Sequence, residues 1–383
     1  MRRARRLPWP PTRTPVVVAA LGVSVLAVTF ALNAHAARAA LDQVWSPFVL
    51  VTGLLLIGLV ANDDGVFEWL GELLTRISSR GMVVFAGAAI VIVAVTATLN
   101  LDTAVAFLTP VLIHTSRRRG GDDAPWLYGV LLLANAGSLW LPGSNLTNLI
   151  VLGHLHLTGA AFAARMWLPA LGASLVTATV VAVLGRGALG RREVRAPVVV
   201  PSIGVGTVAV VAAVCAVFFL ADAALPVALI GLIAVGWHLG GRRVRMREVV
   251  AIVGPGSLIG LFATAVALGA IGRVWSGPAQ ILAHSDAIAT AVVAAAVSVL
   301  VNNLPAASIF AARVPSHPFA LLVGLNLGPN LAVTGSLAWL LWWRSARSAG
   351  AAPSLVRASR WGAVITPLSI AAALALLALS GRA

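Results

Sequence analysis

The residues best suited to bind a small solute lie in the stretch 133–151, where an apolar segment breaks at Pro142 and Gly143. The polar residues that follow the break are Ser144, Asn145, Thr147 and Asn148. The bilayer core offers no water to unpaired backbone groups, and each one costs several kcal/mol. An unwound segment at this depth must therefore line a cavity or be buried in protein, and transporters bind solutes with the N–H and C=O groups of such half-helix ends. The competing interpretation is a kinked helix whose polar side chains bond neighbouring helices.

A second break of the same kind occurs roughly 200 residues later, as expected for a transporter built from two repeats. Placing Asn135 on Asn326 aligns the two stretches without a gap, and Ser144–Leu146 then matches Gly335–Leu337. The candidate binding residues of this second copy are Thr334, Gly335 and Ser336. An internal match of this length favours the transporter interpretation over the kinked helix.

Each break is preceded by an apolar segment that carries polar residues at its centre, which predicts a re-entrant hairpin with a polar tip. The first hairpin covers residues 82–116 and the second 284–312; their candidate site residues are Asn100, Asp102 and Thr103, and Asn302, Asn303 and Pro305. Asp102 is the carboxylate expected near the middle of the membrane, where an ionisable residue costs about 2.5 to 3.5 kcal/mol on insertion scales. It is therefore a candidate proton carrier or ion ligand, and the alternative is a protonated Asp hydrogen-bonded inside the helix bundle.

Composition predicts the class of protein. The chain of 383 residues is 60% apolar and 10% charged, which is typical of an all-α polytopic membrane protein. The net charge of +15 comes from arginines next to membrane segments, so no nucleic-acid partner is expected. The single cysteine, Cys215, excludes a disulfide within the chain and a site with several thiolates. The pair His154 and His156 lacks a third ligand nearby in sequence, so neither a metal nor a cofactor is expected.

The distribution of the arginines predicts how the protein is oriented in the membrane. The predicted topology consists of the two hairpins and nine crossings. The crossings are 15–32, 46–60, 126–153, 162–184, 198–220, 223–240, 250–271, 319–343 and 361–379. An amphipathic interfacial helix is expected over residues 62–80. This topology places 22 of the 27 arginines on the cytoplasmic side. The amino terminus is then cytoplasmic, and the second hairpin enters from outside.

The predicted organisation is two inverted repeats, each with a re-entrant hairpin and a discontinuous transmembrane helix. Residues 1–184 form the amino-terminal repeat with the broken helix 126–153, and residues 185–222 form a connecting loop and helix. Residues 223–383 form the carboxy-terminal repeat with the broken helix 319–343.

Four runs carry a resemblance to a known family: LNLDTAVAFLTPVLI, NAGSLWLPGSNLTNLIV, SVLVNNLPA and GLNLGPNLAVTGSLAWLLW. Together they resemble the arsenite and antimonite efflux permeases of the ion transporter superfamily, which are related to citrate permeases and divalent-anion symporters. The family's Asn-Leu-Pro matches residues 303–305, its Gly-Ser-Leu-Ala matches 335–338, and its tip aspartate matches Asp102. The first tip differs, because it reads Asn-Leu-Asp-Thr where the permeases have Asn-Asp-Gly.

The expected function is a secondary active transporter of the inner membrane that exports arsenite or antimonite in exchange for protons. The alternative is an ion-coupled symporter of a small carboxylate such as citrate or a dicarboxylate. A passive channel is less favoured because two inverted broken elements suit alternating access, and an enzyme because no nucleophile and base cluster at one depth. The expected partners are the lipid bilayer, a small inorganic or carboxylate substrate, and protons or sodium. A homodimer is compatible with the sequence, and so is a partner ATPase, since the chain has no phosphate-binding loop.

The hairpin topology predicts that residues on either side of residues 82–116 face the same compartment. Single cysteines replacing Ser78 or Arg118 in a Cys215→Ser protein should both react with a membrane-impermeant maleimide from the cytoplasmic side, whereas Arg313→Cys should react from outside. Labelling of residues 78 and 118 from opposite sides would replace the hairpin by two crossings.

Overall fold

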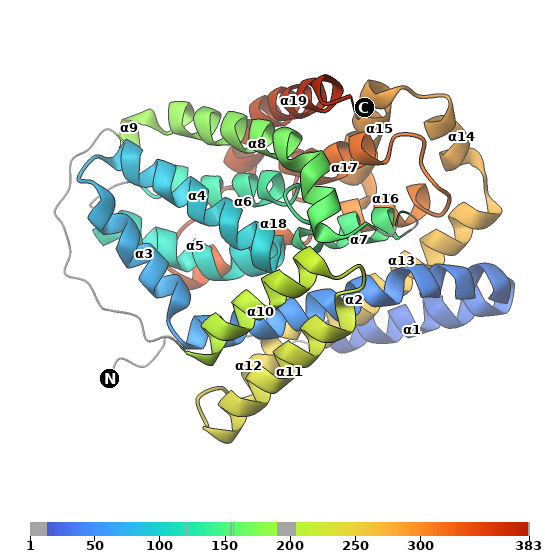
Figure 1. Cartoon of the computed structure of the whole chain (residues 1–383), viewed down its shortest axis with the longest axis horizontal. Helices are drawn as coiled ribbons and strands as arrows, with labels where there is room; N and C mark the ends of the chain where they lie inside the picture. Colours follow the sequence, from blue (N-terminus) through green and yellow to red (C-terminus); the bar gives the residue numbers. More distant parts are fainter. Residues whose placement is uncertain (1–13, 119–121, 154, 156, 190–203, 382–383) are drawn as a thin grey trace.

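The computed structural model describes residues 14–118, 122–153, 155, 157–189 and 204–381. Over these residues the secondary structure consists of helices and turns with one isolated bridge residue, which confirms the predicted all-α class (Figure 1). Five helical segments are long and apolar enough to cross a membrane: Ala34–Asp63, Gly81–Leu99, Gly159–Leu184, Met246–Val274 and Leu355–Leu379. Shorter apolar helices accompany them, so the chain is a multi-pass membrane protein.

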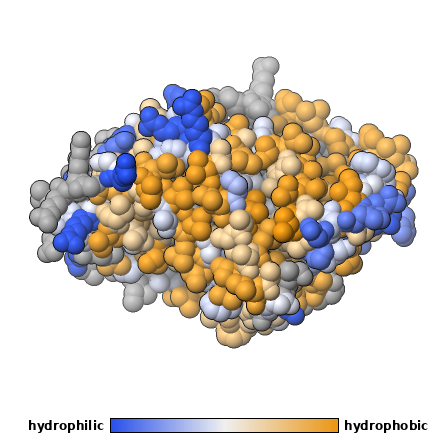
Figure 2. All heavy atoms as spheres, turned by 90° about the horizontal axis from the view of Figure 1, so that it is seen from above, coloured by the Kyte–Doolittle hydropathy of each residue, from blue (hydrophilic) through white to orange (hydrophobic). Residues whose placement is uncertain are grey.

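The surface is that of a protein surrounded by lipid. Figure 2 shows a face on which hydrophobic residues dominate, with hydrophilic residues gathered mainly toward its ends. Side chains such as Val16 and Ile233 are 72% and 71% exposed. Apolar surface of this extent would be costly in water but fits the hydrocarbon core.

The first three helices correct the predicted amino-terminal elements; they are α1 (Thr14–Leu32), α2 (Ala34–Asp63) and α3 (Val66–Ile77). The predicted crossing 46–60 is only the second half of α2, whose first turn is capped by Asn33 through its Oδ1 and the N–H of Ala36 at 2.9 Å. The first half of α2 was not predicted because it contains polar residues such as Gln43, which lower its hydropathy. The amphipathic helix predicted at 62–80 is the shorter α3, which buries Phe67 and Leu74 against α4 and α5.

The first hairpin and first break comprise α4 (Gly81–Leu99), α5 (Leu101–Arg118), α6 (Ala124–Gly137), the short η1 (Pro142–Ser144) and α7 (Leu146–Leu152). Two helices follow, α8 (Gly159–Leu184) and α9 (Arg186–Leu189). The connecting and scaffold helices are α10 (Val205–Phe219), α11 (Ala224–Gly240), α12 (Met246–Val253), α13 (Pro255–Val274) and α14 (Gly277–Ala283). The start of the predicted crossing 198–220 lies outside the described residues. The second hairpin and break are α15 (Ala287–Val301), α16 (Asn303–Phe310), α17 (Pro318–Leu327), η2 (Gly328–Leu331) and α18 (Ala338–Ser348), and α19 (Leu355–Leu379) ends the described fold.

The two halves pack in a corresponding way. Helix α4 contacts α6 in the first half, as α15 contacts α17 in the second. The second arm of each hairpin contacts the broken helix of the other half: α5 packs against α18, and α16 packs against α7. This exchange interlocks the halves, and α8 and α19 pack together beside them. The duplication and the inverted orientation of the halves stay predictions.

The predicted crossing 250–271 lies within the apolar segment Met246–Val274, which the structure divides into α12 and α13. Gly254 adopts φ +56°, a left-handed conformation that glycine reaches without a side-chain clash, and it ends α12. Pro255 has no N–H to donate, so it begins the new helix α13. None of the residues of α12 is buried.

The close approach of α19 to η2 depends on a glycine. A Cβ atom built on Gly362 would lie 1.7 Å from the carbonyl oxygen of Asn330, so Gly362→Ala must displace one of these backbones. We expect this variant to lose folded yield and to unfold at a lower temperature in detergent. Gly236→Ala is the control, because a Cβ there meets nothing within 4 Å. Equal melting temperatures for the two variants would contradict this packing.

Candidate functional site

The two hairpin tips use the same backbone device. Asn100 and Asn302 stand between the hairpin arms with φ +129° and +82° and extended ψ, a conformation that residues other than glycine rarely adopt. The Oδ1 of Asn100 accepts the N–H of Thr103 at 2.7 Å, and the Oδ1 of Asn302 accepts the N–H of Leu304 at 3.3 Å. Each asparagine therefore caps the helix that follows it, which turns the chain and leaves the next residues at the tip.

The first break satisfies its own backbone. The carbonyl of Ser138 accepts hydrogen bonds from the Ser144 hydroxyl at 2.6 Å and from the Asn148 amide at 2.7 Å. The carbonyl of Leu141 accepts the N–H of Ser144 at 3.2 Å and the Asn148 amide at 3.3 Å. These polar side chains therefore replace the helical partners that the break removes.

The second break is held by the second hairpin tip. The carbonyl of Gly335 accepts the backbone N–H of Asn303 at 2.8 Å, and the carbonyl of Thr334 accepts the Asn302 amide at 3.2 Å. The Thr334 hydroxyl donates to the carbonyl of Val299 at 2.6 Å. Tip and break therefore form one unit in the second half.

Buried asparagines join the two breaks. The Oδ1 of Asn326 accepts the Ser138 hydroxyl and the Asn145 amide, both at 2.6 Å, and its Nδ2 donates to the Oδ1 of Asn148 at 2.7 Å. All four side chains are at most 3% exposed. A fully paired polar network in a low dielectric fixes one arrangement of its members, because any alternative leaves buried groups unpaired.

A reciprocal contact comes from the residue that the internal alignment matched to Asn326. Asn135 donates its amide to the Oδ1 of Asn330 at 2.8 Å, so each aligned asparagine reaches into the other half. Sequence reasoning used Asn135 and Asn326 only as markers of the duplication and missed Asn330. The signal was their alignment, which placed two amides at equivalent positions of two apolar helices.

A cavity of about 100 Å³ lies where both tips and both breaks meet. Its polar wall residues are Asp102, Asn145, Ser257, Asn302, Asn303, Ser336 and Arg344. Asp102 is partly buried, and no hydrogen bond joins its carboxylate to another described residue. Within the described part of the chain the buried Ser336 hydroxyl also has no partner. The cavity therefore offers one carboxylate and one hydroxyl that make no hydrogen bond to the described residues.

The structure divides the predicted site residues into three groups. Those that line the cavity are Asp102, Asn145, Asn302, Asn303 and Ser336. Asn100 and Thr103 are buried beside them in the first tip, and Pro305 is buried within α16. The remaining residues belong to the breaks and hold backbone in place or lie between packed helices: Ser144, Thr147 and Asn148 in the first, and Thr334 and Gly335 in the second.

Arg344 gives the cavity wall a positive charge that sequence reasoning missed. It lies on α18, and the turn of the helix before it places Leu340 and Leu341 on the same wall. In sequence Arg344 resembles the start of a cytoplasmic loop. Only the position of α18 against α5 brings it to the cavity.

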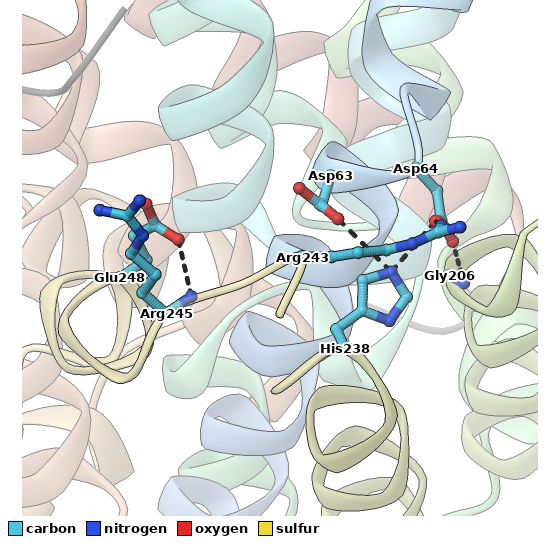
Figure 3. A network of polar contacts seen from close by, with 7 residues as sticks. All are labelled: Asp63, Asp64, Gly206, His238, Arg243, Arg245 and Glu248. Carbon is cyan, nitrogen blue, oxygen red and sulfur yellow. Dashed lines mark hydrogen bonds and ion pairs between the residues drawn. The ribbon is translucent and has the colours of Figure 1, made fainter. Parts of the chain in front are cut away.

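A second polar cluster joins α2, α10 and α11 (Figure 3). The carboxylate of Asp64 accepts the N–H of Gly206 at 2.6 Å, and its other oxygen lies 3.1 Å from the Nε2 of the buried His238 and 3.5 Å from Arg243. Asp63 lies 3.6 Å from the same Nε2. The sequence assigned these two aspartates to the polar face of the interfacial helix, but they end α2.

This cluster also bears on the expectation that no metal is bound. Asp63, Asp64 and His238 offer three ligand atoms within 4.8 Å of one another. Both oxygens of Asp64 are already engaged by protein groups, so a cation would have to compete with the donors of Gly206 and Arg243. The pair His154 and His156 lies outside the described residues.

The family model described as "Citrate transporter" matches residues 9–343. The arsenical pump membrane protein of Escherichia coli is 24% identical over 336 residues, an alignment that covers 78% of each chain. The crystal structure of the YdaH transporter of Alcanivorax borkumensis, described as having an unusual topology, is similar in fold, with a TM-score of 0.50 and 14% identity over 97% of this chain and 98% of that one.

The family match spans both hairpins and both breaks, which are the elements that build the cavity. The similar proteins are membrane transport proteins, and the fold likeness extends over almost the whole chain. The chain therefore belongs to the citrate transporter family, a family of membrane transporters.

Proposed function

We propose that this protein is a secondary active transporter that exports arsenite or antimonite in exchange for protons by alternating access. It acts in the inner membrane with its amino terminus in the cytoplasm. The observation that carries this proposal is the Asp102 carboxylate, which faces a cavity built from both hairpin tips and both breaks and has no hydrogen-bond partner among the described residues.

The cavity suits a small, uncharged oxyacid. Arsenite at neutral pH is mostly the trihydroxide, whose O–H groups both donate and accept hydrogen bonds. The amides of Asn302 and Asn303 and the hydroxyl of Ser336 provide neutral partners around the cavity. A volume of about 100 Å³ is smaller than the pockets that bind drug-sized ligands, so it favours a small inorganic solute. The arsenical pump protein of similar sequence supports the same substrate class.

Asp102 supports coupling to protons. It lies at the second position of α5 beside the buried Thr103 and near the helix amino terminus. A carboxylate in this place can be neutral while the cavity faces one side and lose its proton while the cavity faces the other. One charge that moves across 100 mV gains about 2.3 kcal/mol, which is enough to drive a solute against a roughly fiftyfold gradient.

A symporter of a small carboxylate is the second candidate, and Arg344 is the observation that favours it. A guanidinium on the cavity wall can pair with a carboxylate of the substrate. The citrate transporter model that matches the chain supports the same class. In this case Asp102 would serve as the ligand of a coupling ion that accompanies the anion.

We expect Asp102→Asn to abolish uphill export while substrate binding remains, because the amide keeps the shape of the carboxylate but cannot release a proton. The measurement is proton flux coupled to arsenite flux in proteoliposomes over a pH series. Asp286→Asn is the control, since Asp286 caps α15 through its Oδ1 and asparagine caps a helix equally well. Uphill export by Asp102→Asn with the parental pH profile would exclude Asp102 as the proton carrier.

Replacing Arg344 with Gln distinguishes the two substrate classes. For a neutral substrate, arsenite transport should stay within about twofold of the parent, because an uncharged substrate makes no ion pair with Arg344. For a carboxylate substrate, the affinity should fall by about tenfold or more, since hydrogen bonds to charged groups contribute about 1.5 to 3 kcal/mol. The assay compares arsenite and citrate flux in the same vesicles, with Arg347→Gln, on the same helix, as the control. A tenfold loss confined to citrate would overturn the arsenite proposal.

A further inference from the structure

One side chain of α2 contacts elements of both halves at the end of the molecule that the arginine distribution predicts to be external. The Nε2 of Gln43 donates to the carbonyl of Ile150 at 2.9 Å and to the carbonyl of Ala311 at 2.8 Å. Ile150 lies in the last turn of α7, and Ala311 caps the carboxyl end of α16. The carboxyl end of a helix carries carbonyls with few helical donors and the negative end of the helix dipole, so a shared N–H donor stabilises both ends.

Arg273 of α13 holds this glutamine in place. Its Nη2 donates to the Oε1 of Gln43 at 2.7 Å and to the carbonyl of Ala39 at 3.1 Å, and its Nη1 donates to the carbonyl of Gly269 at 2.9 Å. The bond to Oε1 turns the amide so that its nitrogen points toward Ile150 and Ala311. α2 and α13 are therefore fastened together and, through Gln43, to the ends of α7 and α16.

The same two helices line the cavity farther along. Val51 and Leu55 of α2 and Leu258 and Leu261 of α13 face it. At 1.5 Å per residue, Val51 lies about 12 Å along α2 from Gln43, and Leu261 about 18 Å along α13 from Arg273. α2 and α13 pack together (Figure 1). Through Gln43 this pair is bonded to the ends of α7 and α16, and farther along the same pair lines the cavity.

A weak point in α2 lies between these two regions. Pro47 has no N–H, so it cannot make the regular helical hydrogen bond to the residue one turn earlier. A helix interrupted in this way bends more easily at that turn. The part of α2 that carries Gln43 and the part that lines the cavity can therefore move by different amounts.

We propose that Gln43, oriented by Arg273, is the latch that keeps the external passage closed while the cavity faces the cytoplasm. The bonds of Gln43 to Ile150 and Ala311 must break before α7 and α16 can separate from α2 and α13. Gln43 is thus a positioning residue that sets the balance between the two orientations of the cavity. This inference rests on the proposed alternating access and does not depend on the substrate.

The test uses single-cysteine reporters in the Cys215→Ser protein, reconstituted in vesicles. Ala312→Cys reports on the latch side, because Ala312 is 6% exposed and lies against Gly272 of α13. Ser257→Cys reports on the exposed wall of the cavity. Gln43→Leu should raise the rate at which an impermeant maleimide labels Ala312→Cys from outside several-fold and lower the rate for Ser257→Cys from the cytoplasmic side.

Two further variants complete the design. Gln43→Glu keeps an acceptor for Arg273 but removes the donors to Ile150 and Ala311, so it should shift labelling in the same direction even where Gln43→Leu folds poorly. Gln280→Leu is the matched control, because the only other glutamine of the chain is exposed.

The outcomes separate the latch from the transport proposal. Unchanged labelling at both reporters in folded Gln43→Leu and Gln43→Glu proteins overturns the latch. Faster labelling at both reporters also overturns it, because that result indicates general loosening. Opposite shifts at the two reporters support the latch even if neither arsenite nor citrate flux is found, in which case only the proposed substrate fails.

Discussion

The structure depends on one constraint: backbone that leaves the helix inside a membrane must find hydrogen-bond partners within the protein. Two helices break at the depth of the cavity, and each break has a different solution. The first is satisfied by the side chains of Ser144 and Asn148, which reach back to the carbonyl of Ser138. The second is satisfied by the hairpin tip, through Asn302 and Asn303. Without these partners each break would leave backbone groups unpaired within the membrane, at a cost of several kcal/mol each.

The same constraint separates residues that hold the site from residues that can bind a solute. Asn326 engages Ser138, Asn145 and Asn148, so little of its hydrogen-bonding capacity is left for a ligand. Asp102 has the opposite character, because the fold places its carboxylate at the cavity and gives it no partner among the described residues. A rigid, saturated network beneath an unsaturated carboxylate is an arrangement that suits ion coupling, since protonation of the carboxylate alters the cavity without dismantling its support.

The helices α2 and α13 connect this site to the rest of the molecule. Both helices line the cavity. Away from it α2 contacts α7, α13 contacts α16, and Gln43 of α2 bonds the carboxyl ends of α7 and α16. Each of the two helices also has an interruption. In α2 it is Pro47, and at the start of α13 it is the left-handed Gly254 beside the cavity wall. Long helices that are packed at one end and interrupted near the other can change their relative position without losing their core contacts.

The sequence by itself determined the class of protein, the two breaks and the two polar tips, because hydrophobic length and local composition control which segments enter a membrane and where helices end. It also paired Asn135 with Asn326. Tertiary structure decided which polar residues form hydrogen bonds within the protein. Asn145 bonds Asn326, which lies 181 residues away in sequence, and a local sequence pattern cannot predict so distant a partner. It likewise decided that Arg344 lines the cavity and that Asp64 pairs with His238, since both depend on how distant helices pack. Local sequence predicts where a helix breaks, but only the packing of the other helices selects the partners of the break.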